Sequence, residues 1–115
     1  MFGTKRALTA SFCLVILLSC MPSYAESRYT AEEFLTQPAA SKSGYIQVSL
    51  MTANFIANQN DAKQGKCIGD WYDSNRTGTE EYILGIMAKN KNHHPLAIIM
   101  ALAEKQCGEF SYKGD

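Results

Sequence analysis

The sequence predicts an all-α protein, a small bundle of about four helices with one disulfide, made with a cleaved signal peptide. Three observations support this fold class. Apolar residues beyond residue 30 recur at spacings of three and four, which is the helical period. No segment alternates apolar and polar residues for long enough to build a sheet. Beyond the export signal two cysteines remain, an even number in an exported chain.

Residues 1–25 have the three parts of a secretory signal. Lys5 and Arg6 give a positive start, and residues 12–18 form a short apolar run. Small residues at the −3 and −1 positions predict cleavage after Ala25. The apolar run is too short for a transmembrane helix, which needs about 20 apolar residues. We therefore expect one domain at residues 26–115, in the periplasm.

An alternative end of the signal is a loose lipoprotein-type site at Cys20, where acylation would tether the same domain to a membrane. In either case the processed domain keeps nine basic and eleven acidic residues, a net charge of −2. This balance gives no polybasic surface, so we expect no nucleic-acid partner. No other segment is apolar enough to predict stable membrane insertion.

Cys67 and Cys107 are the cysteines left after removal of the signal, and we predict that they form one structural disulfide. In the chain-entropy model, closing a loop of this length stabilises the fold by about 4 kcal/mol. The alternative is a redox or nucleophilic thiol. The chain has no Cys-x-x-Cys motif, and His93 and His94 are its only histidines.

The first half of the domain predicts two helices. Thr30 and Glu33 have the spacing of a capping box, which opens a short helix that ends before Pro38. Small residues at 39–44 predict a link. Residues 43–60 form the best helix pattern, with an apolar stripe that we expect to face the core, although it could also be a partner surface. The stripe comprises Tyr45, Val48, Met51, Phe55 and Ile56, with Leu50 and Ala53 beside them.

The second half predicts a long connection and two more helices. Residues 61–78 are rich in Gly, Asp, Asn and Ser, and we expect them to form a loop. Thr77 or Thr79 would then begin a helix that runs to about Lys91. Asn92 would cap a last helix that ends at Gly108. This last helix is apolar almost all round, so we expect it to be the central one.

Groups for catalysis are scarce, so we predict that the protein is not an enzyme and holds no metal or cofactor. The acid pairs at 32–33 and 80–81 lie where helices are predicted to begin, and negative charge at a helix start is the simpler explanation for them. His93 and His94 are adjacent and point in different directions, and no partner at metal-ligand spacing is present.

The predicted loop at 69–76 is the better candidate for function. Trp, Tyr and Arg are the residues that most often anchor protein interfaces. We expect Trp71 to fold inward and Tyr72 to point outward, or the whole loop to serve only as a lid over the core. The candidate partner-binding residues are Asp70, Trp71, Tyr72, Asp73 and Arg76.

The order of several short motifs resembles the Rap/Tai family of immunity proteins from bacterial type VI secretion systems. Gly44-Tyr45-Ile46 begins the long helix, and Cys67-Ile68 follows it. A His94-Pro95 junction precedes a closing apolar helix that ends on Cys107. The resemblance covers about residues 43–107, and the two cysteines match the family's disulfide positions. Two features depart from the family pattern: no cysteine stands just before Gly44, and a longer aromatic segment follows Cys67.

The resemblance implies a periplasmic immunity protein that binds and inhibits a peptidoglycan amidase effector, and so protects the producing cell from intoxication by itself or its siblings. Because family members are often dimeric, it also suggests a homodimer. The candidate loop would block the cleft of the amidase. The alternative is a periplasmic acid-stress chaperone, a class that is also short, helical and linked by one disulfide, and that exposes apolar surface in acid.

Overall fold

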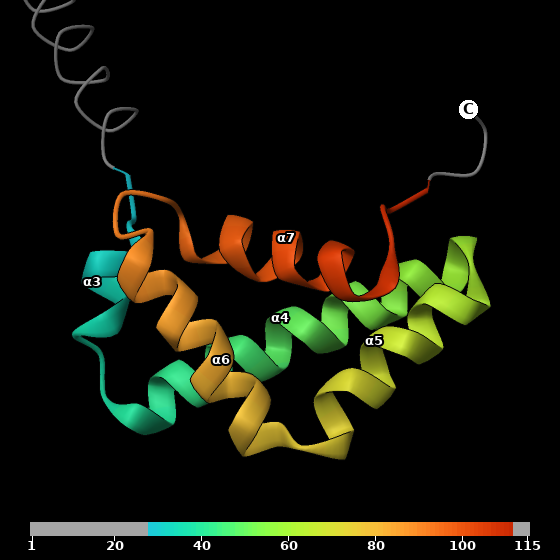
Figure 1. Cartoon of the computed structure of the whole chain (residues 1–115), viewed down its shortest axis with the longest axis horizontal. Coiled ribbons are helices and arrows are strands. Elements are labelled where there is room, and N and C mark those ends of the chain that lie inside the picture. The colour runs from blue at the N-terminus through green and yellow to red at the C-terminus, as the bar shows by residue number, and fades with distance from the viewer. Residues whose placement is uncertain (1–27, 112–115) are drawn as a thin grey trace, which may run out of the picture.

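The computed structural model of the protein describes residues 28–111, so the predicted cleavage at Ala25 and the alternative at Cys20 lie outside the described residues. The described part is all-α, as predicted, and has five helices rather than about four. No strand occurs between residues 28 and 111. The helices are α3 (Ala31–Leu35), α4 (Ala39–Asn60), α5 (Ala62–Ser74), α6 (Arg76–Lys89) and α7 (Pro95–Cys107) (Figure 1).

The short helix α3 begins as the sequence predicts, because the backbone N–H of Glu33 donates to Oγ1 of Thr30 at 3.3 Å. The predicted link at 39–44 is wrong. Helix α4 begins at Ala39, directly after Pro38, and continues to Asn60. The small residues that suggested a link include Ala39 and Ala40, and alanine is the strongest helix former.

The predicted loop at 61–78 is also wrong, because most of it is helix α5. Asp61 both ends α4 and caps α5, accepting from the backbone N–H of Lys63 at 3.0 Å. The glycines that suggested a loop instead let α5 pack closely on α4. A Cβ atom at Gly65 would lie 2.1 Å from Oδ1 of Asn58, and one at Gly69 would lie 2.5 Å from Nδ2 of Asn54.

The caps of the last two helices also differ from those predicted. Asn75 caps α6 in place of Thr77 or Thr79, and accepts from the N–H of Gly78 at 3.0 Å. His94 caps α7 in place of Asn92, with Nδ1 accepting from the N–H of Leu96 at 3.1 Å. Gly108 ends α7 as predicted, with a φ of +93° that glycine adopts without strain.

Helices α4 and α5 lie side by side as a hairpin, and α7 lies across them (Figure 1). Helix α6 packs against α3, α5 and α7. Helix α7 therefore touches all three other long helices, which agrees with its predicted central position, although Leu96 at its start is 40 % exposed. The predicted disulfide is present: Cys67 and Cys107 join the middle of α5 to the end of α7, with their Cα atoms 5.7 Å apart.

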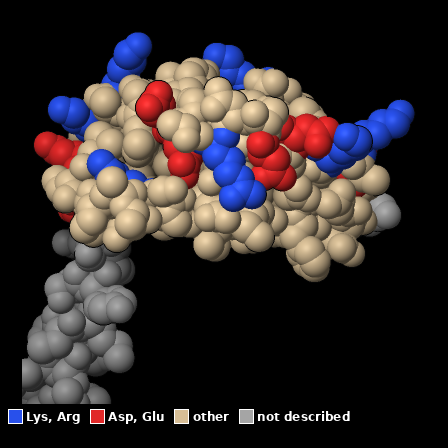
Figure 2. All heavy atoms as spheres, turned by 90° about the horizontal axis from the view of Figure 1, so that it is seen from below, with Lys and Arg blue, Asp and Glu red and all other residues tan. Residues whose placement is uncertain are grey.

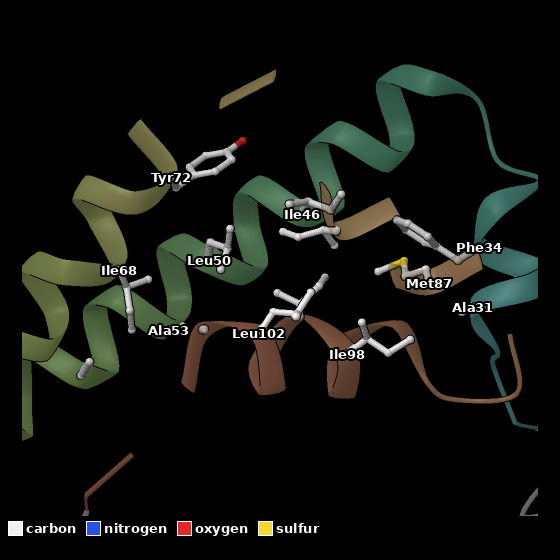
Figure 3. Close-up of a cluster of buried hydrophobic side chains, with 14 residues drawn as sticks. Ala31, Phe34, Ile46, Leu50, Ala53, Ile68, Tyr72, Met87, Ile98 and Leu102 are labelled. Atoms are coloured by element: carbon white, nitrogen blue, oxygen red, sulfur yellow. The ribbon is translucent and has the colours of Figure 1, made fainter. Parts of the chain in front are cut away.

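The core lies between α4, α5 and α7 and continues to α3 and α6 (Figure 3). Ile46 and Leu50 of α4 point toward Leu102 of α7, and Tyr72 of α5 lies beside Leu50. Phe34 and Met87 close the other end of the core. All these side chains are at most 7 % exposed.

Helix α4 turns a different side to this core than the apolar stripe predicts. The side that packs inward, which we call the covered face, consists of Ile46, Ser49, Leu50, Ala53 and Ala57. The opposite side, which we call the open face, is exposed to solvent and consists of Val48, Met51, Thr52, Phe55 and Ile56. Because apolar residues occupy both sides of α4, the helical period alone does not identify the buried side.

Candidate functional site

The candidate partner-binding residues lie where α5 meets α6, and we call residues 70–76 the α5–α6 corner. Asn75 is the one residue between the two helices; it ends α5 and caps α6. Ser74 Oγ and Thr79 Oγ1 both donate to the carbonyl of Trp71, at 3.3 and 3.2 Å. The segment is therefore a hydrogen-bonded helical corner, and a partner would meet a preorganised surface.

Of the two aromatic residues of the corner, Tyr72 has the reverse of its predicted orientation, whereas Trp71 packs against the core as predicted, but only partly buried. Tyr72 points inward and is 5 % exposed, whereas Trp71 is half-buried at the edge of the core. Cζ of Arg76 lies 5.3 Å from the centroid of the Tyr72 ring, within the range of a cation–π contact. Nε and Nη2 of Arg76 donate to Oδ1 of Asp73 at 3.2 and 2.9 Å. Tyr72 thus supports the corner from beneath and is not its outer contact.

A carboxylate on α6 ties the corner to the start of α4. The Tyr72 hydroxyl donates to Oε1 of Glu80 at 3.2 Å, and the Ser43 hydroxyl donates to the same oxygen. Burial raises the pKa of the Tyr72 phenol, and the nearby negative charge of Glu80 raises it further. The phenol therefore stays protonated and remains a donor at neutral pH. Sequence patterns gave no sign that Ser43 and Glu80 belong to this network.

The outer surface of the corner is polar and carries both signs of charge. Asp70 pairs with Lys66 at 2.6 Å, and Asp73 pairs with Arg76 at 2.9 Å, with all four side chains more than half exposed. In the view from below, positive and negative side chains are interspersed among uncharged ones, without an area of one sign (Figure 2). Exposed ion pairs of this kind are weak, so these charges are free to exchange partners at an interface.

A grouping that could bind a metal ion is not found in the described part of the chain. Among residues 28–111, no three His, Cys, Asp or Glu side chains converge on a point that could hold a metal ion. His94 uses Nδ1 to cap α7, and Glu80 is engaged by Tyr72 and Ser43. Of the helices the structure describes, none has the length and apolarity needed to cross a membrane.

An apolar pocket of about 240 Å³ opens along α4, where its covered face meets its open face. The segment after α7 lies at its edge, held by the Gln64 side chain, whose Nε2 donates to the carbonyls of Gly108 and Glu109 at 2.8 and 2.9 Å. Glu104 Oε2 accepts from the N–H of Phe110 at 3.2 Å. The pocket is lined by Ala53, Ile56, Ala57, Asn60, Met100, Glu104, Phe110 and Ser111.

Comparison of the chain with protein-family models, with curated proteins and with solved structures finds no match.

Proposed function

We propose that this protein is a periplasmic immunity protein that binds and inhibits a type VI secretion peptidoglycan amidase. The observation that carries the proposal is the order of the motifs at Gly44-Tyr45-Ile46, Cys67-Ile68, His94-Pro95 and Cys107. In the fold these motifs lie in α4, in α5 and at the two ends of α7. The disulfide between α5 and α7 fits an oxidising compartment such as the periplasm.

Inhibition would be steric, with the α5–α6 corner placed over the cleft of the amidase. Asp70, Asp73 and Arg76 would supply directed charge, and Trp71 would supply apolar area at the edge of the contact. A corner fixed by Asn75 and by the Glu80 network loses little conformational entropy on binding, which favours affinity. Tyr72 would act indirectly, by holding Arg76 in place.

The test is to measure peptidoglycan hydrolysis by the amidase encoded beside this gene, with and without the protein purified from the periplasm. We expect stoichiometric inhibition and a complex that survives gel filtration. An amidase that keeps full activity in the presence of excess protein would overturn the proposal.

A charge reversal tests whether the α5–α6 corner, and not another part of the surface, contacts the amidase. Removal of the Tyr72 side chain would disturb the fold, because this residue is buried. Asp73 is exposed and is therefore the better position for a substitution that tests the contact. We expect Asp73→Arg to weaken inhibition at least about tenfold by placing a like charge beside Arg76 and at the contact. Glu109→Arg makes the same charge change at an exposed site after α7 and should inhibit like the wild type. Equal inhibition by both variants would exclude the corner as the contact.

A second candidate function is that of a periplasmic acid-stress chaperone, and the open face of α4 favours it. Val48, Met51 and Phe55 are each more than half exposed, which is apolar surface of the kind that captures unfolded clients. Aggregation of an acid-unfolded client at about pH 2–3 distinguishes the two functions. Protection by substoichiometric or equimolar protein would favour the chaperone, and unchanged aggregation would exclude it.

A further inference from the structure

The pocket along α4 is enclosed by parts of the chain that lie far apart in sequence, and we call it the α4–α7 pocket. Ala53 lines it from the side of α4 that faces α7 (Figure 3), and Met100 lines it from α7. Phe110, beyond the end of α7, adds another wall. Its volume of about 240 Å³ exceeds the roughly 150 Å³ of a protein cavity that holds benzene. The α4–α7 pocket can therefore hold an apolar group about half as large again as benzene, such as naphthalene.

The wall at residues 108–111, which we call the strap, is fixed by hydrogen bonds. Gln64 is 5 % exposed, and its side-chain amide donates to two carbonyls of the strap, those of Gly108 and Glu109. The N–H of Phe110 donates to Oε2 of Glu104 at 3.2 Å. These anchors lie on α5 and α7, which the disulfide joins. The pocket is thus formed before a ligand arrives, as is usual for small-molecule sites.

Glu104 supplies the only charge among the described residues that line the α4–α7 pocket. Its side chain is half-buried, and most of the lining around it is apolar. A carboxylate can accept about four hydrogen bonds, so the one from the N–H of Phe110 leaves capacity for another donor. No Lys or Arg is among these described lining residues. The pocket should therefore attract an ammonium group and repel an anion.

We propose that the α4–α7 pocket binds a small organic cation, an apolar body that carries one ammonium group. The apolar body would lie against Ala53, Met100 and Phe110, and the ammonium group would pair with Glu104. A ligand of this size has about a dozen non-hydrogen atoms, so we expect a Kd on the order of 100 µM. The pocket shares no residue with the α5–α6 corner, and its ligand does not depend on the proposed inhibition of an amidase.

Three naphthalene compounds of similar size and different charge test the proposal: naphthylmethylamine, naphthylmethanol and naphthoate. Each is titrated at about pH 7 into the processed protein, expressed as the full-length chain and purified from the periplasm, and amide NMR spectra report binding. We expect the amine to bind with shifts centred on Ala57, Glu104 and Phe110. The alcohol should bind about fivefold and the acid at least about tenfold more weakly. An amine that binds elsewhere on the chain, or no more tightly than the acid, would overturn the proposal.

Glu104→Gln isolates the contribution of the charge. Glutamine keeps an oxygen that can accept from the N–H of Phe110, so the strap should stay in place. The amine should lose about fivefold in affinity and match the alcohol, whose affinity should not change. Glu109→Gln removes the same charge from an exposed strap residue that does not line the pocket, and it should keep the preference for the amine. A Glu104→Gln variant with the wild-type preference would contradict the proposed ion pair.

A lysine introduced on α4 tests the position of the ligand from the opposite charge. Ile56 lines the pocket and is 48 % exposed, so Ile56→Lys should fold and weaken binding of the amine at least about tenfold. Val48→Lys places the same charge roughly 12 Å away along the helix, beyond the Debye length of about 8 Å at physiological salt. It should change the affinity less than about twofold. Circular dichroism checks that both variants remain folded, and equal affinities for the amine would place the ligand outside the pocket.

Discussion

The two faces of α4 are similar in composition and different in surroundings. The covered face has Ile46, Leu50 and Ala53 at 4 % exposure or less, while the open face has Val48 and Phe55 at more than 60 %. Both are mostly apolar, and neither carries a charge. The difference between them arises from their neighbours, because α5 and α7 pack on only one side of the helix.

This contrast shows what an apolar stripe can predict. It identifies a helix surface that is more stable when buried, but it does not identify the element that buries that surface. Within one chain, α5 and α7 bury the covered face, and the Cys67–Cys107 disulfide holds these two helices together. The open face stays exposed to solvent in the described part of the chain. Changes to the covered face should therefore lower stability, and changes to the open face should leave the stability of the single chain almost unchanged.

Among changes that affect the covered face, removal of the disulfide should lower the free energy of unfolding most. Replacing Cys67 and Cys107 with alanine releases the link between α5 and α7, and we expect the free energy of unfolding to fall by about 4 kcal/mol. Urea denaturation of the oxidised wild type and the double variant measures this change. Reduction of the wild type with dithiothreitol should reproduce it. A difference below about 1 kcal/mol would mean that packing alone keeps α5 and α7 over the covered face.

A pair of truncations compares the two faces directly. Leu50→Ala opens a cavity in the core and should lower the free energy of unfolding by about 3 kcal/mol. Phe55→Ala removes a larger but exposed side chain and should change stability by less than about 0.5 kcal/mol. Both are measured by urea denaturation at low micromolar concentration. Similar losses for the two variants would show that the open face is covered within the chain.

The sequence carries enough information for the helical class, the Thr30 cap and the Gly108 stop, because these depend on local chemistry. The disulfide was predictable because two cysteines remain after the predicted signal. The prediction fails at α5, where Gly65 and Gly69 suggest a loop but serve to bring two helices together. This role depends on Asn58 and Asn54 of the preceding helix, which no local pattern reveals.

The candidate site was predictable in part. The position of the exposed charges at Asp70, Asp73 and Arg76 agrees with an accessible surface. The orientation of Tyr72 could not be derived, because it follows from the helical phase of α5 and from the distant partners Ser43 and Glu80. The sequence does contain an indication of the open face, because residues 43–60 include no charged side chain.

The close approach of α5 to the flank of α4 is tested by two glycine-to-alanine changes. At Gly65 the new Cβ would lie 2.1 Å from Oδ1 and 3.0 Å from the backbone nitrogen of Asn58, so we expect a loss of about 1–2 kcal/mol. Gly85 is a helical glycine on α6 with nothing within 4 Å of the Cβ position. Gly85→Ala should therefore stabilise the protein by about 0.5–1 kcal/mol through helix propensity. Stabilisation by both changes would mean that α4 and α5 are not in tight contact at Gly65.

The smallest expected effect is on the pH dependence of stability, through the buried Tyr72 phenol beneath the α5–α6 corner. The pKa of Tyr72 is raised above its usual value by burial and by Glu80, so its contribution to stability is complete below about pH 10 and is lost as the pH rises through the folded-state pKa. Tyr72→Phe removes this ionisation, so its urea midpoint should fall less steeply above pH 10 than that of the wild type. Some loss of stability at high pH should remain in the Tyr72→Phe variant, because burial also raises the pKa of Tyr45. Tyr82→Phe, an exposed residue outside the Glu80 network, is the matched control. Identical slopes for the wild type and Tyr72→Phe would show that Tyr72 does not hold the corner through its buried phenol.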